Sequence, residues 1–345
     1  MALAQQVQLQ REPGARNDFV RRVAGSPALQ LVGRRLLTAI PVLLGVTFLT
    51  FVVMNLIPGN PAQLILGINA TPGAIAKLDA QLGLNHPFWD RYWLWLDGLL
   101  HGNLGIAYSN QQSVNTDIGQ YLPTTCWLLL YALVASLALG IIVAVLSARR
   151  PNGIIDRIGL AISMLGLSVA PYALALVLIY VFSVRLGWFP TISNSLGDSP
   201  LTAIRALTLP AAAIGFPLFA IYTRILRADI VEQMQREDYI VTAKAKGVGP
   251  WRVLVVHATR NSLFTLITLV ALNLGTLIGA LAIIEPIFSL PGIGAELINA
   301  ININDLPLVE GIVLVFALVT VAGNLLADLL YTVLDPRIRY GRAAS

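Results

Sequence analysis

The sequence contains few charged residues and a single cysteine. Only 12% of its 345 residues are Asp, Glu, Lys or Arg, about half of the ~25% that is usual in a soluble domain. In contrast, 56% of the residues are apolar and the mean hydropathy is +0.73. Cys126 alone cannot form a disulfide within the chain or a metal site with several cysteine ligands. Redox chemistry is therefore not indicated, and the composition is typical of a membrane protein.

The sequence also lacks the short motifs of several enzyme classes. No GxxxxGK[ST] loop is present, so the chain has no usual means of holding nucleotide phosphates, and no nucleophile elbow occurs. His86, His101 and His257 have no second histidine or carboxylate at metal-ligand spacing. We therefore predict a non-catalytic chain with no metal or cofactor of its own.

Six apolar segments are long enough to cross a bilayer as helices, which takes roughly 20 residues each. The predicted fold class is all-α, a polytopic membrane protein with six transmembrane helices. Pro41, Pro171, Pro210 and Pro217 fall within these segments and are expected to mark kinks, with a role in gating or simple packing irregularity as equal alternatives. The predicted spans are residues 36–57, 125–147, 159–184, 207–227, 262–284 and 309–334.

Basic residues are distributed unequally between the two sides of these spans. Of the 23 Lys and Arg residues, only Lys77, Arg91, Arg185 and Arg205 lie on one side. Because basic residues resist translocation, both termini are predicted to lie in the cytoplasm, with the chain in the cytoplasmic membrane. The net charge of +5 is thus assigned to topology and not to nucleic-acid binding.

This topology divides the chain into a tail and a membrane domain. Residues 1–33 are polar, and no small-residue cleavage site follows the first apolar run, so we interpret them as a retained cytoplasmic tail and not a signal peptide. Residues 34–345 form the predicted transmembrane domain, with an external segment at 58–122 and a cytoplasmic loop at 224–260.

The external segment is too long to be a bare turn and is expected to have structure of its own. Trp89 and Trp93 are four residues apart and would share one face of a helix. Since aromatic rings prefer the membrane interface, we predict an interfacial helix here, with packing onto neighbouring spans as the alternative.

The spans are expected to contain essentially no ionisable side chain at mid-depth. Arg224, Arg227 and Asp328 lie near span ends. Ion-coupled transporters commonly need buried charges as relays, so an ion-coupling site is not indicated. Asn273 and Thr276 are neutral polar residues at depth in the fifth span, where interhelical hydrogen bonding is the first interpretation and lining of a pathway the second.

The 224–260 loop is the largest and most basic internal loop, and it is predicted to form helix, break and helix. Residues 228–246 favour a helix with charges of both signs. Gly247, Gly249 and Pro250 would end it. This helical loop would protrude from the membrane. It would either be solvated or insert into a cleft of a soluble partner.

This loop resembles the cytoplasmic signature of ATP-binding-cassette (ABC) importer permeases, in the form found in the peptide/nickel branch. Val241 stands where the general signature has Glu, which points to that branch and away from sugar-type permeases. The matching residues are Asp238, Tyr239, Thr242, Ala243, Ala245, Lys246 and Gly247, followed by His257, Ala258 and Asn261.

Further landmarks extend the resemblance over residues 34–342. Asn60 and Asn103 stand where the family usually has Asp, which removes two external carboxylates. The landmark segments are Pro58-Gly59-Asn60-Pro61, Gly102-Asn103-Leu104-Gly105, Phe288-Ser289-Leu290-Pro291-Gly292-Ile293-Gly294 and Asp335-Pro336-Arg337-Ile338-Arg339-Tyr340-Gly341.

The resemblance implies a type I ABC importer permease fold and a multi-subunit transporter. In that family the first permease, which this chain resembles, pairs with a second, homologous permease. Two cytoplasmic ATPase subunits bind ATP and Mg²⁺, and an extracytoplasmic solute-binding protein delivers the substrate. The resemblance assigns ATPase coupling to Asp238, Tyr239, Thr242, Ala243, Ala245, Lys246 and Gly247.

Translocation of di- or oligopeptides is the function expected from this resemblance. Nickel-chelate and glutathione-like solutes are the alternative substrates of the same class. An ion-coupled secondary transporter is the first rival of another class, a channel the second, and a membrane-embedded enzyme a distant third. The secondary transporter would work alone on an ion gradient, whereas the permease requires ATP hydrolysis by a partner.

Overall fold

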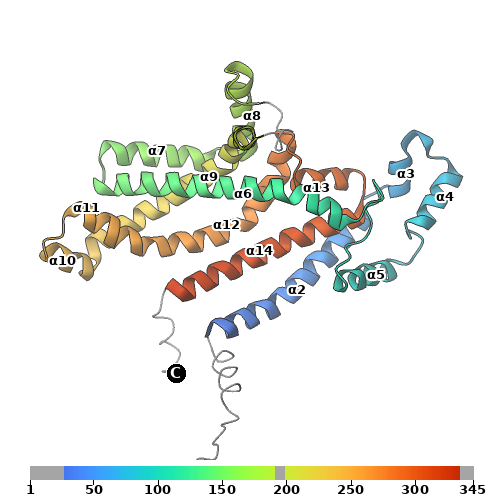
Figure 1. Cartoon of the computed structure of the whole chain (residues 1–345), viewed down its shortest axis with the longest axis horizontal. Helices are drawn as coiled ribbons and strands as arrows, with labels where there is room; N and C mark the ends of the chain where they lie inside the picture. The colour runs from blue at the N-terminus through green and yellow to red at the C-terminus, as the bar shows by residue number, and fades with distance from the viewer. Residues whose placement is uncertain (1–26, 191–198, 335–345) are drawn as a thin grey trace, which may run out of the picture.

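The computed structural model describes residues 27–190 and 199–334. In these residues every regular element is helical, and the only strand-like pairing is an isolated bridge between Ile106 and Ser113. The long helices run along the molecule, with the small helices α3 to α5 at one end and α10 and α11 at the other (Figure 1). The all-α prediction is confirmed.

Five of the predicted spans correspond to long apolar helices. Each is long and apolar enough to cross a membrane. The helix that corresponds to the fifth predicted span begins with a short α-turn and a π-helical stretch and then continues as α12. The helices are α2 (Pro27–Leu56), α6 (Val114–Arg149), α9 (Pro200–Arg236), α11 (Pro250–Arg252) with η3 (Val253–Ala258) and α12 (Thr259–Ile287), and α14 (Leu306–Leu334).

The third predicted span differs from the single helix expected over 159–184. It consists of α7 (Ile154–Ser168), α8 (Pro171–Leu178) and the π-helical η2 (Ile179–Arg185), with a bend of 105° between α7 and α8. Ala170 is extended (ψ 135°) because a residue before proline avoids the helical region. Within the described residues, the helices long and apolar enough to cross a membrane thus number five, or six when the bent pair counts as one span.

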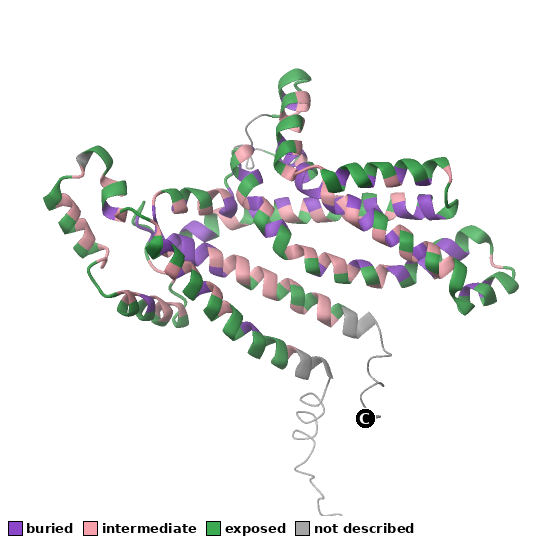
Figure 2. Cartoon of the chain, turned by 180° about the vertical axis from the view of Figure 1, so that it is seen from behind, coloured by how far each residue is buried: buried purple, intermediate pink, exposed green. Residues whose placement is uncertain are grey.

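Helix α9 forms the centre of the bundle. It packs against α6, α7, α8 and α12, and its side chains Tyr222, Leu226 and Ile230 are fully buried. Helix α2 packs mainly on α14 and leaves large apolar side chains uncovered, including Leu37 (70% exposed) and Leu49 (62% exposed). Exposed residues predominate along its length (Figure 2). Lipid or a partner subunit is the natural cover for such a surface.

The external segment folds into α3 (Pro61–Leu66), η1 (Gly67–Asn69), α4 (Pro72–Gln81) and α5 (Phe88–Leu100). The predicted helix around Trp89 and Trp93 is therefore present as α5, and both indoles are exposed. Trp89 also stacks on Phe48 of α2, at 5.9 Å between ring centroids. Tyr92, on the inner face, contacts Phe51 edge-on. Such aromatic pairs each contribute about 0.5–1.5 kcal/mol beyond burial, so α5 is fixed to the C-terminal half of α2.

The landmark Phe288–Gly294 is explained by a buried carboxylate. Glu285 of α12 is completely buried, and its Oε1 accepts a hydrogen bond from Thr125 Oγ1 at 2.7 Å. The other oxygen accepts from the backbone N–H of Ala295 at 3.0 Å, in the first turn of α13 (Ile293–Asn302). Gly292 lies directly against the carboxyl group. This network ties α6, α12 and α13 together.

The spans were predicted to contain essentially no ionisable side chain at mid-depth, and the structure places two buried carboxylates near the ends of the long helices. Glu285 is buried in α12, and Glu310 of α14 is buried with 1% exposure. Both lie toward the α13 end of their helices and not at the centre. The carboxylate of Glu285 is tolerated because its oxygens accept hydrogen bonds from a hydroxyl and the backbone.

Asn60 has a structural role that an aspartate would perform less well. Its Oδ1 caps α3 by accepting from the N–H groups of Ala62 (2.7 Å) and Gln63 (3.4 Å). Its Nδ2 donates to Asp79 Oδ2 of α4 at 3.0 Å. An aspartate would keep the cap but would place one carboxylate against another. The amide thus joins α3 to α4.

The N60D variant is expected to be less stable by about 1 kcal/mol at pH 7.5, because a hydrogen bond becomes a repulsion between carboxylates. Thermal unfolding in detergent at pH 7.5 measures this. N103D is the control, since Asn103 uses its Oδ1 to accept from Gly105 N and an aspartate can do the same. Equal midpoints for N60D and wild type at pH 7.5 would contradict the assignment.

Candidate coupling site

The helix predicted over residues 228–246 is divided in the structure. Residues 228–236 continue α9, Glu237 is extended, and α10 (Asp238–Ala245) follows. The predicted break after this helix is present as the turn at Gly247. Asp238 lies in the first turn and Lys244 in the last, the arrangement that the helix dipole favours. Gly247 adopts a positive φ of 75°, and the N–H of Val248 donates to the carbonyl of Ala243. This Schellman-type ending favours glycine at 247.

The two faces of α10 differ. Ile240 (1% exposed) and Ala243 (8%) belong to the same buried cluster as Val253 and Leu254 of η3. The small Ala243 thus brings α10 close to its own bundle. The other residues assigned to coupling are exposed: Asp238, Tyr239, Thr242, Ala245, Lys246 and Gly247.

Polar contacts fix α10 to the end of α9 and to the start of α12. The hydroxyl of Tyr239 donates to Gln233 Oε1 at 2.5 Å, and Asn261 Nδ2 donates to the same oxygen at 3.0 Å. Partial burial raises the pKa of Tyr239 above its ordinary value, so the phenol keeps its proton at neutral pH. Asn261, a residue of the family signature, is thereby explained as a tie between α9, α10 and α12.

The second half of the loop returns to the bundle through α11. Trp251 lies under the guanidinium of Arg149, at the end of α6, with 5.5 Å from Cζ to the ring centroid. Ala258 is fully buried in η3, and Thr259 Oγ1 donates to the carbonyl of Leu254. The loop therefore contacts α6, α9 and α12, three of the long helices.

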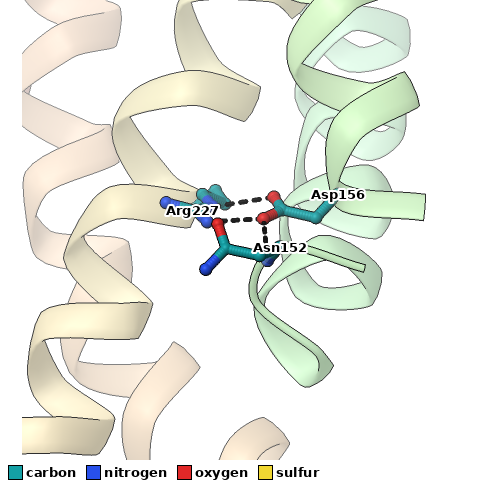
Figure 3. A network of polar contacts seen from close by, with 3 residues as sticks. All are labelled: Asn152, Asp156 and Arg227. Carbon is teal, nitrogen blue, oxygen red and sulfur yellow. Dashed lines mark hydrogen bonds and ion pairs between the residues drawn. The ribbon is translucent and has the colours of Figure 1, made fainter. Parts of the chain in front are cut away.

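A buried ion pair lies beside this loop. Arg227 of α9 binds Asp156 of α7 through Nε at 2.9 Å and Nη2 at 2.6 Å. The N–H of Asn152 donates to the same carboxylate at 2.7 Å. Figure 3 shows the guanidinium facing the carboxylate edge-on, with Asn152 below. Sequence reasoning placed Arg227 near a span end, where a solvated charge is expected, and passed over its partner.

The two residues proposed to line a pathway do not bond to other helices. Asn273 is half-buried and its Nδ2 donates to the carbonyl of Leu269, while the exposed Thr276 donates to the carbonyl of Asn273. Both bonds stay within α12. On the same helix, a Cβ added at Gly275 or Gly279 would meet nothing within 4 Å. The exposed face of α12 is therefore small at Gly275, Thr276 and Gly279, between the large exposed side chains of Leu272 and Ile283.

The arrangement leaves the outer face of α10 exposed. No cluster of three or more His, Cys, Asp or Glu side chains able to hold a metal ion occurs in residues 27–190 and 199–334. Helix α10 is short, exposes charged side chains of both signs, and is followed by Gly247, which has no side chain. The landmark at 335–341 lies outside the described residues, as do residues 1–26 of the predicted tail.

Comparison with known proteins identifies the family. Residues 136–340 match the model of the binding-protein-dependent transport system inner membrane component, and residues 28–129 match the model of its N-terminal region. The two matches together cover most of the chain, including all the helices described above.

Relatives cover nearly the whole chain. The dipeptide transport system permease protein DppB of Alkalihalophilus pseudofirmus is 38% identical over 328 residues, which is 89% of this chain and 98% of that protein. A putative peptide transport system permease protein of Brucella abortus is 40% identical, covering 90% of this chain and 99% of that protein. The glutathione transport system permease protein GsiC of Pectobacterium atrosepticum is 36% identical, covering 89% of this chain and 98% of that protein. The chain is a multi-pass membrane protein and belongs to the family of binding-protein-dependent transport system inner membrane components.

Proposed function

We propose that this chain is a pore-forming permease subunit of an ATP-driven peptide importer, and that α10 receives the movement of a partner ATPase. The observation that carries the proposal is the construction of α10. Its inner face is buried against η3, and its outer face, from Asp238 to Gly247, is free of contacts that would hide it. Because Gln233 of α9 accepts hydrogen bonds from both Tyr239 of α10 and Asn261 of α12, a displacement of α10 reaches two membrane helices at once.

Peptides are the substrate that the relatives favour. Two of those described above are named for dipeptide or peptide transport, and the third for glutathione, which is itself a tripeptide. These names support peptide and glutathione-like solutes over the nickel-chelate alternative.

The ATP and Mg²⁺ would be bound by the partner ATPase and not by this chain. In this proposal the exposed, small-residue face of α12, with Gly275, Thr276 and Gly279, borders the pathway together with a second permease. Close approach of a second helix is easiest where side chains are small. An extracytoplasmic solute-binding protein would deliver the peptide on the side of α3 to α5.

The proposed orientation follows the distribution of basic residues. The α10 end of the bundle holds most of the described Lys and Arg residues, including Arg149, Arg227 and Lys244, and is assigned to the cytoplasm with both termini. Helices α3 to α5 then lie outside, where Trp89 and Trp93 would meet the outer membrane interface.

Co-purification tests the proposal. The tagged chain, expressed with the genes adjacent to its own and solubilised in detergent, should retain a second permease and an ATPase. Hydrolysis of ATP by this complex should rise when peptide and the binding protein are added together. Recovery of the folded chain alone, with uptake driven by an ion gradient, would overturn the proposal in favour of a secondary transporter.

A further inference from the structure

The ion pair between Asp156 and Arg227 is built as a fixed joint. Its two hydrogen bonds are side by side, which defines the orientation of both groups as well as their distance. The side chain of Asp156 is 1% exposed and that of Arg227 is 19% exposed. Burial removes the competition with water that weakens surface pairs. Loss of either partner would leave the other charge buried without compensation.

The turn between α6 and α7 contributes a further hydrogen bond to this ion pair. Asn152 adopts a positive φ of 65°, which asparagine tolerates better than most residues, and this conformation accompanies the donation from its N–H to Asp156 Oδ2. The carboxylate therefore receives three hydrogen bonds and is fixed before α7 begins its second turn. Figure 3 shows the turn wrapping beneath the carboxylate.

Close packing continues from the ion pair along α7. Asp156, Gly159, Ser163 and Gly166 form one buried face of this helix. A Cβ added at Gly166 would lie 2.7 Å from the Cβ of Ala220 in α9, so the two helices are in contact without room for a side chain. Helix α7 is thus held against α9 at both ends of a common face, by charge at one end and by steric fit at the other.

Helix α9 leads directly to the coupling helix. It is continuous from Pro200 to Arg236, and only Glu237 separates it from α10. In contrast, the hydrogen bond from Thr265 Oγ1 of α12 to Asp229 of α9 lies in an exposed setting. Water competes for exposed polar contacts, so the joint to α7 is the firmer one.

We propose that the Asp156–Arg227 pair is a positioning element of transport, which locks α7 to α9 so that both helices move as one body when α10 is displaced. Since α7 continues through the 105° bend into α8, which itself packs on α9, the movement extends to α8 as well. The inference rests on the proposed function, because it requires that α10 receives the movement.

Distance measurement in the assembled transporter tests the joint without weakening it. Spin labels at I158C on α7 and E232C on α9, both exposed positions, are introduced into a chain with Cys126 replaced by alanine. The distance between labels should be the same without nucleotide and with ATP bound, while a label at V241C on α10 moves relative to the partner ATPase. In R227Q the distance between α7 and α9 should broaden or shift on ATP binding. A change in the parent protein itself would overturn the inference.

Transport per ATP hydrolysed gives the second readout. In R227Q, uptake of the peptide that the parent complex takes up fastest should fall at least tenfold, while ATP hydrolysis stays within twofold. The charge-swapped double variant D156R/R227D should recover part of the uptake. The matched control is R224Q, an exposed arginine three residues away on the same helix. Equal losses of uptake, hydrolysis and assembled complex would indicate a merely structural pair and overturn the inference.

The two proposals fail in different ways. If a bulky residue at Gly247 leaves transport normal, the coupling role of α10 is wrong. If it abolishes transport while R227Q transports like the parent, α10 couples but the ion pair does not carry the movement.

Discussion

Replacing Gly247 by tryptophan is expected to reduce transport at least 100-fold while the chain still inserts into the membrane. Two effects combine. A residue other than glycine at φ 75° costs roughly 1–2 kcal/mol, which distorts the end of α10. The indole also projects outward, since no atom of the chain lies within 4 Å of an added Cβ. The bulk is thus directed at the partner and not at the bundle. Peptide uptake and ATPase co-purification measure the effect.

Two control variants separate strain from bulk. G247N tolerates the positive φ and adds a small side chain, so it should retain about half of the transport rate. G249A adds a Cβ in open space at a φ of −59° and should behave like wild type. Normal uptake by G247W, with the ATPase still bound, would show that the tip of α10 does not contact the partner closely.

Replacing Gly294 by alanine is expected to destabilise the chain by about 3 kcal/mol, near the upper end for overpacking. The added Cβ would lie 2.7 Å from the carbonyl carbon of Leu281 and 2.8 Å from the nitrogen of Ala282. These are backbone atoms of α12 that cannot rotate away. The shift would also displace Ala295, whose N–H donates to Glu285. Thermal unfolding in detergent measures the loss.

The control for this variant is G119A. Gly119 lies within α6, and a Cβ there would meet nothing within 4 Å, so alanine should leave stability unchanged or raise it by up to ~1 kcal/mol. An unfolding midpoint of G294A equal to that of G119A would contradict the close packing of α13 on α12.

The long helices could be predicted from the sequence because membrane insertion leaves a simple signal. An uninterrupted apolar run of sufficient length has few other structures in lipid. A kink was predicted at Pro171 and is present, but the size of the bend between α7 and α8 was not predicted, because Val169 and Ala170 are as apolar as their neighbours. The informative residue was Pro171, which restricts the residue before it as well as its own N–H.

Helix α10 was predicted from its local residues, and its orientation was not. Gly247 signals the end of α10, because glycine is the residue that most often ends a helix. Ala243 was assigned to the partner-facing side, together with Gly247. It lies instead on the face toward η3, since the side of a short helix that is buried depends on residues elsewhere in the chain.

The buried carboxylates were not recognised because their partners are remote. Asp156 pairs with Arg227 on another helix, and Glu285 accepts from Thr125, far away in the sequence. No local pattern connects such residues. The one available signal was the spacing of Gly292 and Gly294, which indicates close approach of the backbone to another group.

Peptide uptake into proteoliposomes containing the assembled transporter tests the central claim most directly. Uptake is measured with ATP, with a non-hydrolysable ATP analogue, and with ATP plus ionophores that collapse ion gradients. The proposed function predicts that uptake stops with the analogue and continues with the ionophores. Uptake that persists with the analogue and stops with the ionophores would contradict it and would identify an ion-coupled transporter.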